Sequence, residues 1–233
     1  MHYDVALQPG VLERRYKRFL ADVALDNGQR ITAHCPNTGS MLGCAEPGQR
    51  VWLSRSDNPR RKYAHTWEQV AMASGVRVGI HTGRTNALVF EAIAAGELIP
   101  EADGSGGIQT EVNVPNAPMR ADFWLPASGA YVEVKNVTAA VSNGVAVFPD
   151  APSERGVRHL DVLEQLVQSG TPGVLVFCAQ RADVEAIRPA DDIDPTYGRT
   201  LRRVMDAGVE VIGLGARVHE RGIEVDRRVP VVT

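Results

Sequence analysis

The chain has 233 residues, of which 44% are hydrophobic and 23% are charged, as is typical of a soluble globular protein. The formal net charge of −3 excludes a protein that binds nucleic acid through a large overall positive charge. The longest apolar runs, such as VLVFCA at 174–179, are too short for a membrane-spanning helix. We therefore expect no membrane partner.

Cysteine usage and the N-terminal sequence both predict a cytoplasmic protein. Cys35, Cys44 and Cys178 are odd in number and lack CxxC spacing, which favours reduced thiols over a disulfide framework or a zinc site. The first ten residues, MHYDVALQPG, lack the basic start and the long apolar stretch of a secretory signal.

Residues 1–80 have the pattern of a small all-β domain. Strand-forming segments, among them 15–25, 29–35, 50–56 and 63–73, are separated by the turn sequences DNG (26–28), PNTGS (36–40) and EPG (46–48). Asn27 and Gly28 tolerate positive φ angles and so favour a hairpin. With five short strands and no convincing helix, the pattern predicts a small β-barrel of the OB type.

The N-terminal part is also the basic part of the chain. Residues 1–75 hold 10 Lys and Arg against 7 Asp and Glu, whereas residues 76–233 hold 15 against 21. Barrels of this type bind nucleic acid strands through a basic groove with aromatic side chains. Basic residues interleave with Tyr16 and Phe19 or gather in one loop, and the predicted nucleic-acid contacts are Arg14, Arg15, Lys17, Arg18, Arg60, Arg61 and Lys62. The alternative is that these charges only face solvent.

Residues 81–233 predict an α/β (α+β) domain with a mixed sheet and helices on both of its faces. Apolar spacing predicts a helix at 85–98 that stops near Gly96, and a helix at 153–170 capped by Ser153. A further helix is predicted at 194–208. The predicted strands are 106–114, 119–125, 131–137, 173–180 and 209–215, with a closing hairpin at 217–232.

The segment YVEVKNV at 131–137 predicts a site because its strand period places Glu133 and Lys135 on one face. Strand 119–125 should pair with it antiparallel, which brings Asp122 close to Glu133. Two neighbouring carboxylates favour a divalent ion such as Mg²⁺ or Mn²⁺ between them. Lys135 would then lie where a phosphate binds, and Glu91 on the preceding helix is a fourth candidate. The alternative is a solvated Glu–Lys pair.

Other polar residues lie near this site by chain order. Arg155 is at the start of a predicted helix, where phosphates bind favourably, and His159 follows one turn later as a weaker candidate base. Gln180 and Arg181 end a buried strand, where α/β sites gather. Asn37, Thr38 and Ser40 form either a polar contact loop or an ordinary turn.

Six segments together resemble the sugar fermentation stimulation protein A (SfsA) family over nearly the whole chain: RRYKRFLADV, HCPNTGSMLG, WLSRSDNPRRK, EVKNVT, FPDAPSERGVRHL and FCAQR. The resemblance implies an N-terminal OB-like domain, a C-terminal PD-(D/E)xK nuclease-like (restriction-endonuclease-like) domain and DNA binding. It also implies Asp122, Glu133 and Val134 as the metal-binding residues, Lys135 as the catalytic lysine and Glu91 as the helix carboxylate. The leading Pro of the superfamily motif is replaced by Ala121.

Three functions are consistent with this sequence. The first is a DNA-binding protein with a Mg²⁺-dependent phosphodiester-hydrolysing site. The second is a DNA-binding regulator of sugar metabolism genes that does not cut, and the third is a metal-dependent hydrolase of a nucleotide or a small phosphate ester. A homodimer is consistent with the first, because nucleases that cut both strands of a duplex often work as dimers.

Overall fold

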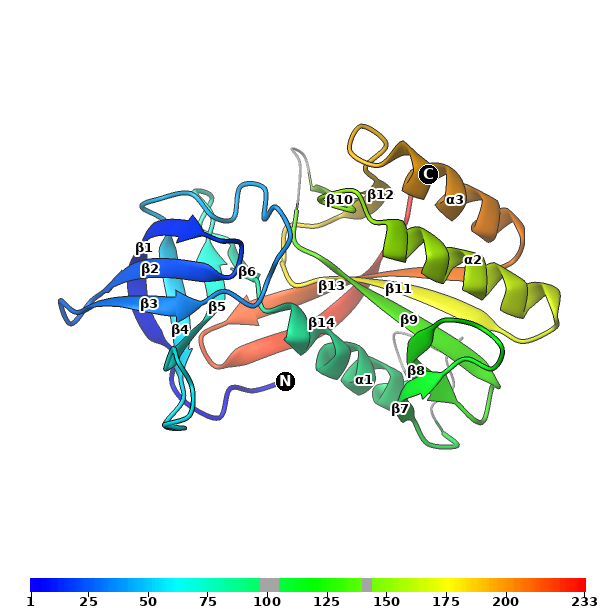
Figure 1. Cartoon of the computed structure of the whole chain (residues 1–233), viewed down its shortest axis with the longest axis horizontal. Coiled ribbons are helices and arrows are strands. Elements are labelled where there is room, and N and C mark those ends of the chain that lie inside the picture. The colour runs from blue at the N-terminus through cyan, green and yellow to red at the C-terminus, as the bar shows by residue number, and fades with distance from the viewer. Residues whose placement is uncertain (97–104, 140–143) are drawn as a thin grey trace.

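The computed structural model describes residues 1–96, 105–139 and 144–233. Within these ranges an all-β part, drawn in blue and cyan in Figure 1, lies beside a larger part that has a sheet between helices. None of the helices in the described ranges is both long enough and apolar enough to span a bilayer.

The N-terminal part is a closed six-stranded sheet. Its strands are β1 (Gln8–Tyr16), β2 (Leu20–Leu25), β3 (Arg30–His34), β4 (Arg50–Arg55), β5 (His65–Ala71) and β6 (Arg77–Gly79). They pair in the order β3-β2-β1-β4-β5-β6, and a parallel bridge from His34 to Thr66 joins β3 to β5. The inward side chains, Trp67 and Leu53 among them, are fully buried. This arrangement confirms the predicted barrel.

The predicted single strand at 15–25 is wrong, because the chain turns back within it. β1 ends at Tyr16 and β2 begins at Leu20, and the two pair antiparallel. Lys17 and Arg18 have φ angles of 49° and 65°, in a region that residues other than Gly, Asn and Asp seldom occupy. The turn therefore has no sequence signal, and it places Lys17, Arg18 and Phe19 at an exposed hairpin tip.

The C-terminal part has a mixed six-stranded sheet in the order β14-β13-β11-β9-β8-β7. The strands are β7 (Gln109–Asn113), β8 (Arg120–Leu125), β9 (Ala130–Val137), β11 (Gly173–Ala179), β13 (Glu210–His219) and β14 (Gly222–Val229). β9, β11 and β13 are parallel to one another, and β8 and β14 pair antiparallel with their neighbours. The predicted closing hairpin is real, but its first strand starts earlier, at Glu210.

Helices cover both faces of this sheet, as predicted. Helix α1 (Thr85–Ala95) packs on one face and contributes Leu88, Val89 and Ile93 to that core. Helices α2 (Glu154–Gln168) and α3 (Pro195–Asp206) pack together on the other face (Figure 1). A short 3₁₀ helix, η1 (Thr82–Arg84), leads into α1. A small parallel pair, β10 (Val145–Phe148) with β12 (Ala186–Pro189), was not predicted.

The helix boundaries follow from capping chemistry. Gly96 ends α1 in the left-handed conformation, as expected for a C-terminal glycine; residues 97 and 98 of the predicted helix lie outside the described residues. The Ser153 hydroxyl accepts a hydrogen bond from the Gly156 N–H at the start of α2. Asp194 caps α3 in the same way, by accepting from the Tyr197 N–H.

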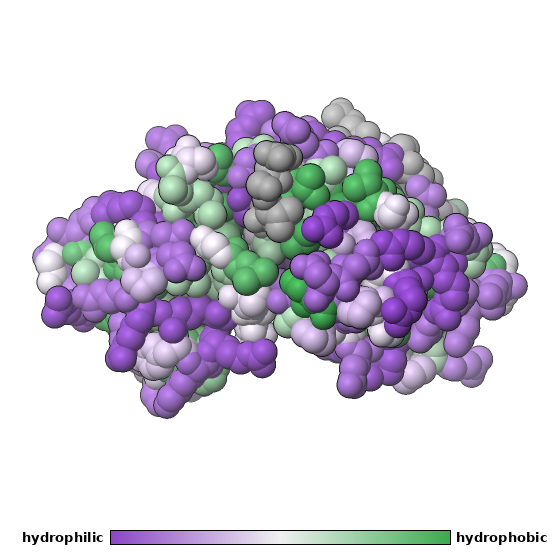
Figure 2. Space-filling view, turned by 90° about the horizontal axis from the view of Figure 1, so that it is seen from above, coloured by the Kyte–Doolittle hydropathy of each residue, from purple (hydrophilic) through white to green (hydrophobic). Residues whose placement is uncertain are grey.

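The two parts are joined through hydrogen bonds along one edge of the barrel. The Gly79 N–H of β6 donates to the Gln180 carbonyl at 2.8 Å, and Val78 forms a β-bridge with Arg181. At the chain's start, His2 bridges to Gly222 on β14. Figure 2 shows hydrophilic residues over both ends of one face, with hydrophobic residues mainly toward the middle. Barrel and sheet therefore form a continuous body.

Candidate functional site

The site is built where β8 and β9 separate. The last paired residues of the two strands are Phe123 and Val132. Beyond this point the Asp122 carboxylate takes the place of a strand partner, because its Oδ2 accepts the Val134 N–H at 2.7 Å. Its Oδ1 accepts from the Asn86 side-chain amide of α1 at 2.7 Å. Asp122 is thereby held at the opening between a helix and two strands.

Glu133 lies on β9 and points toward the face that α2 covers. Its carboxyl Oε1 is 2.6 Å from His159 Nδ1 and also pairs with the Lys135 ammonium. The Arg155 Nε–H donates to the other ring nitrogen of His159 at 3.3 Å, so Nδ1 is the ring nitrogen that donates to Glu133. Glu133 Oε2 is buried and has no hydrogen-bond partner within the described part of the chain.

The two carboxylates have opposite pKa shifts. Burial and the neighbouring charge of Glu133 raise the pKa of Asp122, and the bonds from Val134 and Asn86 offset only part of this rise. Burial alone would also raise the pKa of Glu133, but the hydrogen bond from His159 and the charge of Lys135 outweigh it and lower that pKa. Glu133 is therefore the ionised partner, and Asp122 carries the cost of a second negative charge.

These residues fit a hard divalent cation. A buried carboxylate oxygen without a partner, beside a second carboxylate, is a ligand set that such ions prefer. Within residues 1–96, 105–139 and 144–233, no three His, Cys, Asp or Glu side chains gather closely enough to enclose an ion. A cation held by Asp122 and Glu133 would complete its shell with main-chain oxygen, water or substrate, as Mg²⁺ usually does. Val134, which follows Glu133 and donates its N–H to Asp122, offers only its main chain.

The structure does not place Glu91 beside Glu133. Its carboxylate accepts a hydrogen bond from the Met1 ammonium at 2.6 Å, and its side chain is 55% exposed. The α1 residue that hydrogen-bonds Asp122 is Asn86, five positions earlier, and Glu91 only lines the same cavity as these two residues. Helical spacing and the family resemblance had both put Glu91 forward.

The basic residues of the barrel have different surroundings. Arg14 is exposed and pairs with Asp22 at 2.7 Å, and Arg15 donates to the main-chain carbonyls of Arg18, Asn37 and Gly39. Arg15 thus holds the loop that follows β3. The remaining predicted contacts are exposed and lie in two groups: Lys17 and Arg18 at the β1–β2 turn, and Arg60, Arg61 and Lys62 between β4 and β5.

The two predicted arginine contacts of the C-terminal part differ sharply. Arg155 is exposed at the first turn of α2, where it donates a hydrogen bond to His159. The Arg181 side chain is 4% exposed, and its guanidinium donates to both carboxyl oxygens of Asp183 and to the Thr138 carbonyl. The structure therefore places Arg181 inside the junction between barrel and sheet, away from any approaching phosphate.

Three residues at the site carried no clear sequence signal. His159 was a minor candidate and is a direct partner of Glu133, while Asn86 was not singled out at all. Tyr197 on α3 is fully buried, its hydroxyl has no partner within the described residues, and burial together with the Glu133 charge raises its pKa. Only a tertiary contact brings α3 close to β9, so local spacing gives no indication of it.

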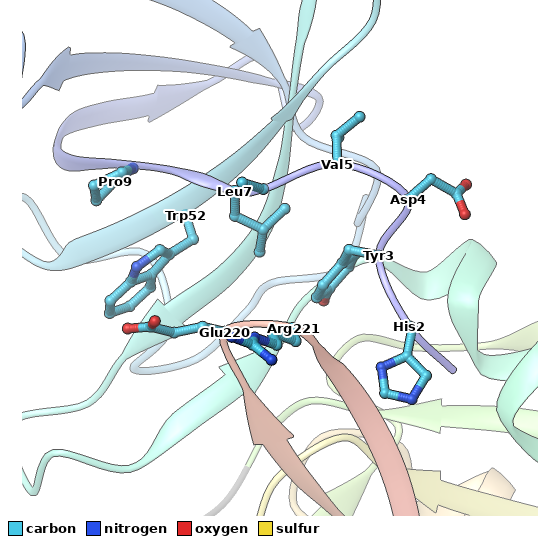
Figure 3. A pocket seen from close by; sticks show the side chains of 10 residues that line it. His2, Tyr3, Asp4, Val5, Leu7, Pro9, Trp52, Glu220 and Arg221 are labelled. Atoms are coloured by element: carbon cyan, nitrogen blue, oxygen red, sulfur yellow. The ribbon is translucent and has the colours of Figure 1, made fainter.

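Two cavities are relevant to the choice of site, one beside Asp122 and one at the barrel. One of about 380 Å³ lies between α1, β7 and β8 and has Asp122 in its wall. Another of about 480 Å³ lies between the N-terminal segment, Trp52 and the β13–β14 turn (Figure 3). In the second cavity, Tyr3 and Trp52 point toward the turn at Glu220 and Arg221, and none of its lining residues belongs to the carboxylate site.

Comparison with known proteins decides the family. Residues 14–80 match the SfsA N-terminal OB domain, and residues 83–222 match the sugar fermentation stimulation protein RE (restriction endonuclease-like) domain. The chain belongs to the SfsA family. The sugar fermentation stimulation protein homolog of Alkalilimnicola ehrlichii is 58% identical over 99% of both chains. The homolog of Pseudomonas putida is 46% identical over 100% of this chain and 99% of its own.

A solved SfsA structure confirms the fold. The structure of Pyrococcus furiosus SfsA in complex with Ca²⁺ has a TM-score of 0.86 and 26% sequence identity, and it covers 100% of this chain and 98% of its own. The predicted architecture, an OB barrel followed by a mixed-sheet restriction-endonuclease-like domain, is therefore correct. The relative also shows that a divalent cation binds a member of the SfsA family.

Proposed function

We propose that this SfsA protein is a DNA-binding protein with a Mg²⁺- or Mn²⁺-dependent phosphodiester-hydrolysing site. One observation carries the proposal: Asp122 and Glu133 converge where β8 and β9 separate, and Glu133 keeps a buried carboxyl oxygen without a partner in the described residues. The Ca²⁺ complex of the Pyrococcus furiosus relative supports a divalent ion in this family.

Each residue has a distinct role in this proposal. When bound, the ion would polarise the phosphate and make water more acidic. Asp122 and Glu133 hold it, and His159 keeps the Glu133 carboxylate oriented through Nδ1. Lys135 lies one pleat beyond Glu133, where its ammonium balances charge on a phosphate oxygen. Arg155, exposed at the α2 start, binds a neighbouring phosphate.

The direct test is a cleavage assay on the full chain. Supercoiled plasmid, linear duplex and single-stranded DNA are incubated with Mg²⁺ or Mn²⁺, and a matched reaction contains a chelator. We expect strand cleavage that requires the ion. DNA binding without any cleavage would instead identify a regulator of sugar metabolism genes that does not cut. Turnover of mononucleotides without binding to polymeric DNA would identify a hydrolase of small phosphate esters.

Replacing exposed barrel cations will weaken DNA binding in a salt-dependent way. For the double variant Arg60→Gln, Lys62→Gln, we expect the slope of log affinity against log salt to fall in magnitude by up to roughly 2, because each lost phosphate contact removes about one unit. The double variant Arg199→Gln, Arg203→Gln removes the same charge from exposed positions of α3 and is the control. Equal slopes for both variants would place the phosphate contacts elsewhere.

Replacing His159 will weaken metal binding without removing it. In His159→Phe the Glu133 carboxylate loses the donor at 2.6 Å, and loss of an outer-shell partner typically costs roughly 10–100-fold in metal affinity. Calorimetric titration with Mn²⁺ measures the change. Arg155→Gln, which removes only the exposed neighbour of His159, should change the Mn²⁺ affinity far less. Unchanged Mn²⁺ affinity in His159→Phe would show that the ion does not use Glu133.

A further inference from the structure

The cavity beside Asp122 is large enough for a ligand and shares Asp122 with the proposed site. Its volume of about 380 Å³ lies within the range of roughly 300–1,000 Å³ that small-molecule sites occupy. It is lined by residues of α1, β7 and β8, namely Asn86, Ala87, Phe90, Glu91, Thr110, Glu111, Asp122 and Phe123. A group bound at Asp122 would therefore have the cavity as its nearest neighbour.

The cavity offers an aromatic surface. Phe90 is 38% exposed, although it is a large apolar residue on a helix. Its ring lies 6.3 Å from that of the buried Phe123, at an angle of 57°, so a second aromatic ring supports it from below. Exposed aromatic side chains next to a phosphate site are platforms on which nucleic acid bases stack. Ala87, one turn earlier on α1, leaves room above the ring.

Two carboxylates lie at the rim of the cavity. Glu91 and Glu111 are about half exposed, and their partners are the Met1 ammonium and Arg120. The register of β7 with β8 is unshifted, so Glu111 lies opposite Asp122, but the two residues are not paired there, and Glu111 has a positive φ angle of 56°. Carboxylates repel a second phosphate but accept hydrogen bonds from the amino groups of bases and from sugar hydroxyls.

We infer that this cavity receives the sugar and base of one unpaired nucleotide adjoining the phosphate at Asp122. The inference rests on the proposed function and names its substrate. A base that is stacked and paired in a duplex cannot enter a cavity in the protein wall, so the nucleotide must first leave the stack, which costs least in single strands and at frayed or damaged positions. The substrate class is therefore single-stranded DNA, or duplex with an unpaired nucleotide.

The test fills the cavity and uses a matched control on the same helix. Ala87 and Ala94 are both exposed on α1, and only Ala87 lines the cavity. Binding of an oligocytidine single strand and of relaxed closed plasmid is measured in Ca²⁺ by fluorescence anisotropy and filter retention. We expect Ala87→Trp to bind the single strand roughly 10-fold or more weakly, with plasmid binding and Ca²⁺ affinity unchanged. Ala94→Trp should match the parent.

Two variants at Phe90 test stacking separately. Phe90→Tyr keeps an aromatic ring and should retain single-strand affinity, whereas Phe90→Leu keeps apolar bulk without the ring and should lose it. Single-strand affinity in Ala87→Trp equal to that in Ala94→Trp would overturn the inference and leave the proposed function intact. An equal loss on closed plasmid would also overturn it. If Phe90→Leu binds the single strand more weakly than the parent, and the parent neither binds Ca²⁺ nor cleaves DNA, the result would support the cavity and overturn the proposed function.

Discussion

Replacing Asp122 with Asn will abolish both metal binding and cleavage while the protein stays folded. Asparagine keeps the shape of the side chain but removes a charged ligand, and we expect the loss of Mn²⁺ affinity to exceed the roughly 10–100-fold typical of outer-shell changes. We also expect the parent to gain stability from the ion, by about 2.7 kcal/mol at 100 times the dissociation constant. The variant should show no such gain in thermal unfolding with added Mn²⁺.

The raised pKa of Asp122 sets the direction in which stability depends on pH. Burial and Glu133 raise it, so the cost of ionising Asp122 is absent below the ordinary carboxyl pKa of about 3.9 and complete above the raised value. Above that raised value the metal-free parent therefore carries an unfavourable charge, which a bound ion would offset. Lys135→Met is the matched variant: it should lose cleavage and keep Mn²⁺ binding. Full cleavage by Asp122→Asn would disprove the assigned site.

Replacing Arg181 with Met will destabilise the protein and leave its DNA affinity unchanged. The guanidinium is buried and binds Asp183 and the Thr138 carbonyl. Breaking a buried ion pair costs about 3–5 kcal/mol, and we expect the lower end, about 3 kcal/mol, because Asp183 is one-third exposed. For a chain of this size that is a fall of about 6–12 °C in Tm, which calorimetry measures.

Two further measurements check the Arg181 prediction. The Arg181 hydrogen bond lowers the pKa of Asp183, so the stability from this pair is complete above the ordinary carboxyl pKa and is lost as pH falls through the lower, folded value. In Arg181→Met, the free energy of unfolding should therefore depend less steeply on pH in this acid range. Arg30→Met, which breaks an exposed pair with Glu13, should change stability by less than about 1 kcal/mol. A smaller slope of log DNA affinity against log salt in Arg181→Met would show that Arg181 does contact nucleic acid.

Most of the fold was predictable because local chemistry specifies it. Ser153 and Gly96 mark helix ends through side-chain and backbone geometry that operates over a few residues. The turn at Lys17 and Arg18 was missed because it uses residue types that rarely adopt positive φ. The strands β10 and β12 were missed because four residues are too few for a periodic pattern.

Only the site residues on neighbouring segments of the chain were predictable. Strand period and a short turn were enough to bring Asp122, Glu133 and Lys135 together, because β8 and β9 are adjacent in sequence. The partners from other elements, Asn86 and His159, depend on how α1 and α2 pack on the sheet, and residue spacing has no information about that packing. The burial of Arg181 was unpredictable for the same reason, because composition cannot distinguish a buried arginine from an exposed one.

The joint between the two parts has a consequence for biosynthesis. The edge strand β6 of the barrel bonds to Gln180 and Arg181 after β11, and its Arg77 pairs with Glu220 in the β13–β14 hairpin, so its outer partners come from the second half of the chain. A ribosome makes the barrel first and that hairpin last. The edge strand β6 of the nascent barrel therefore lacks these outer partners until most of the sheet domain has been synthesised.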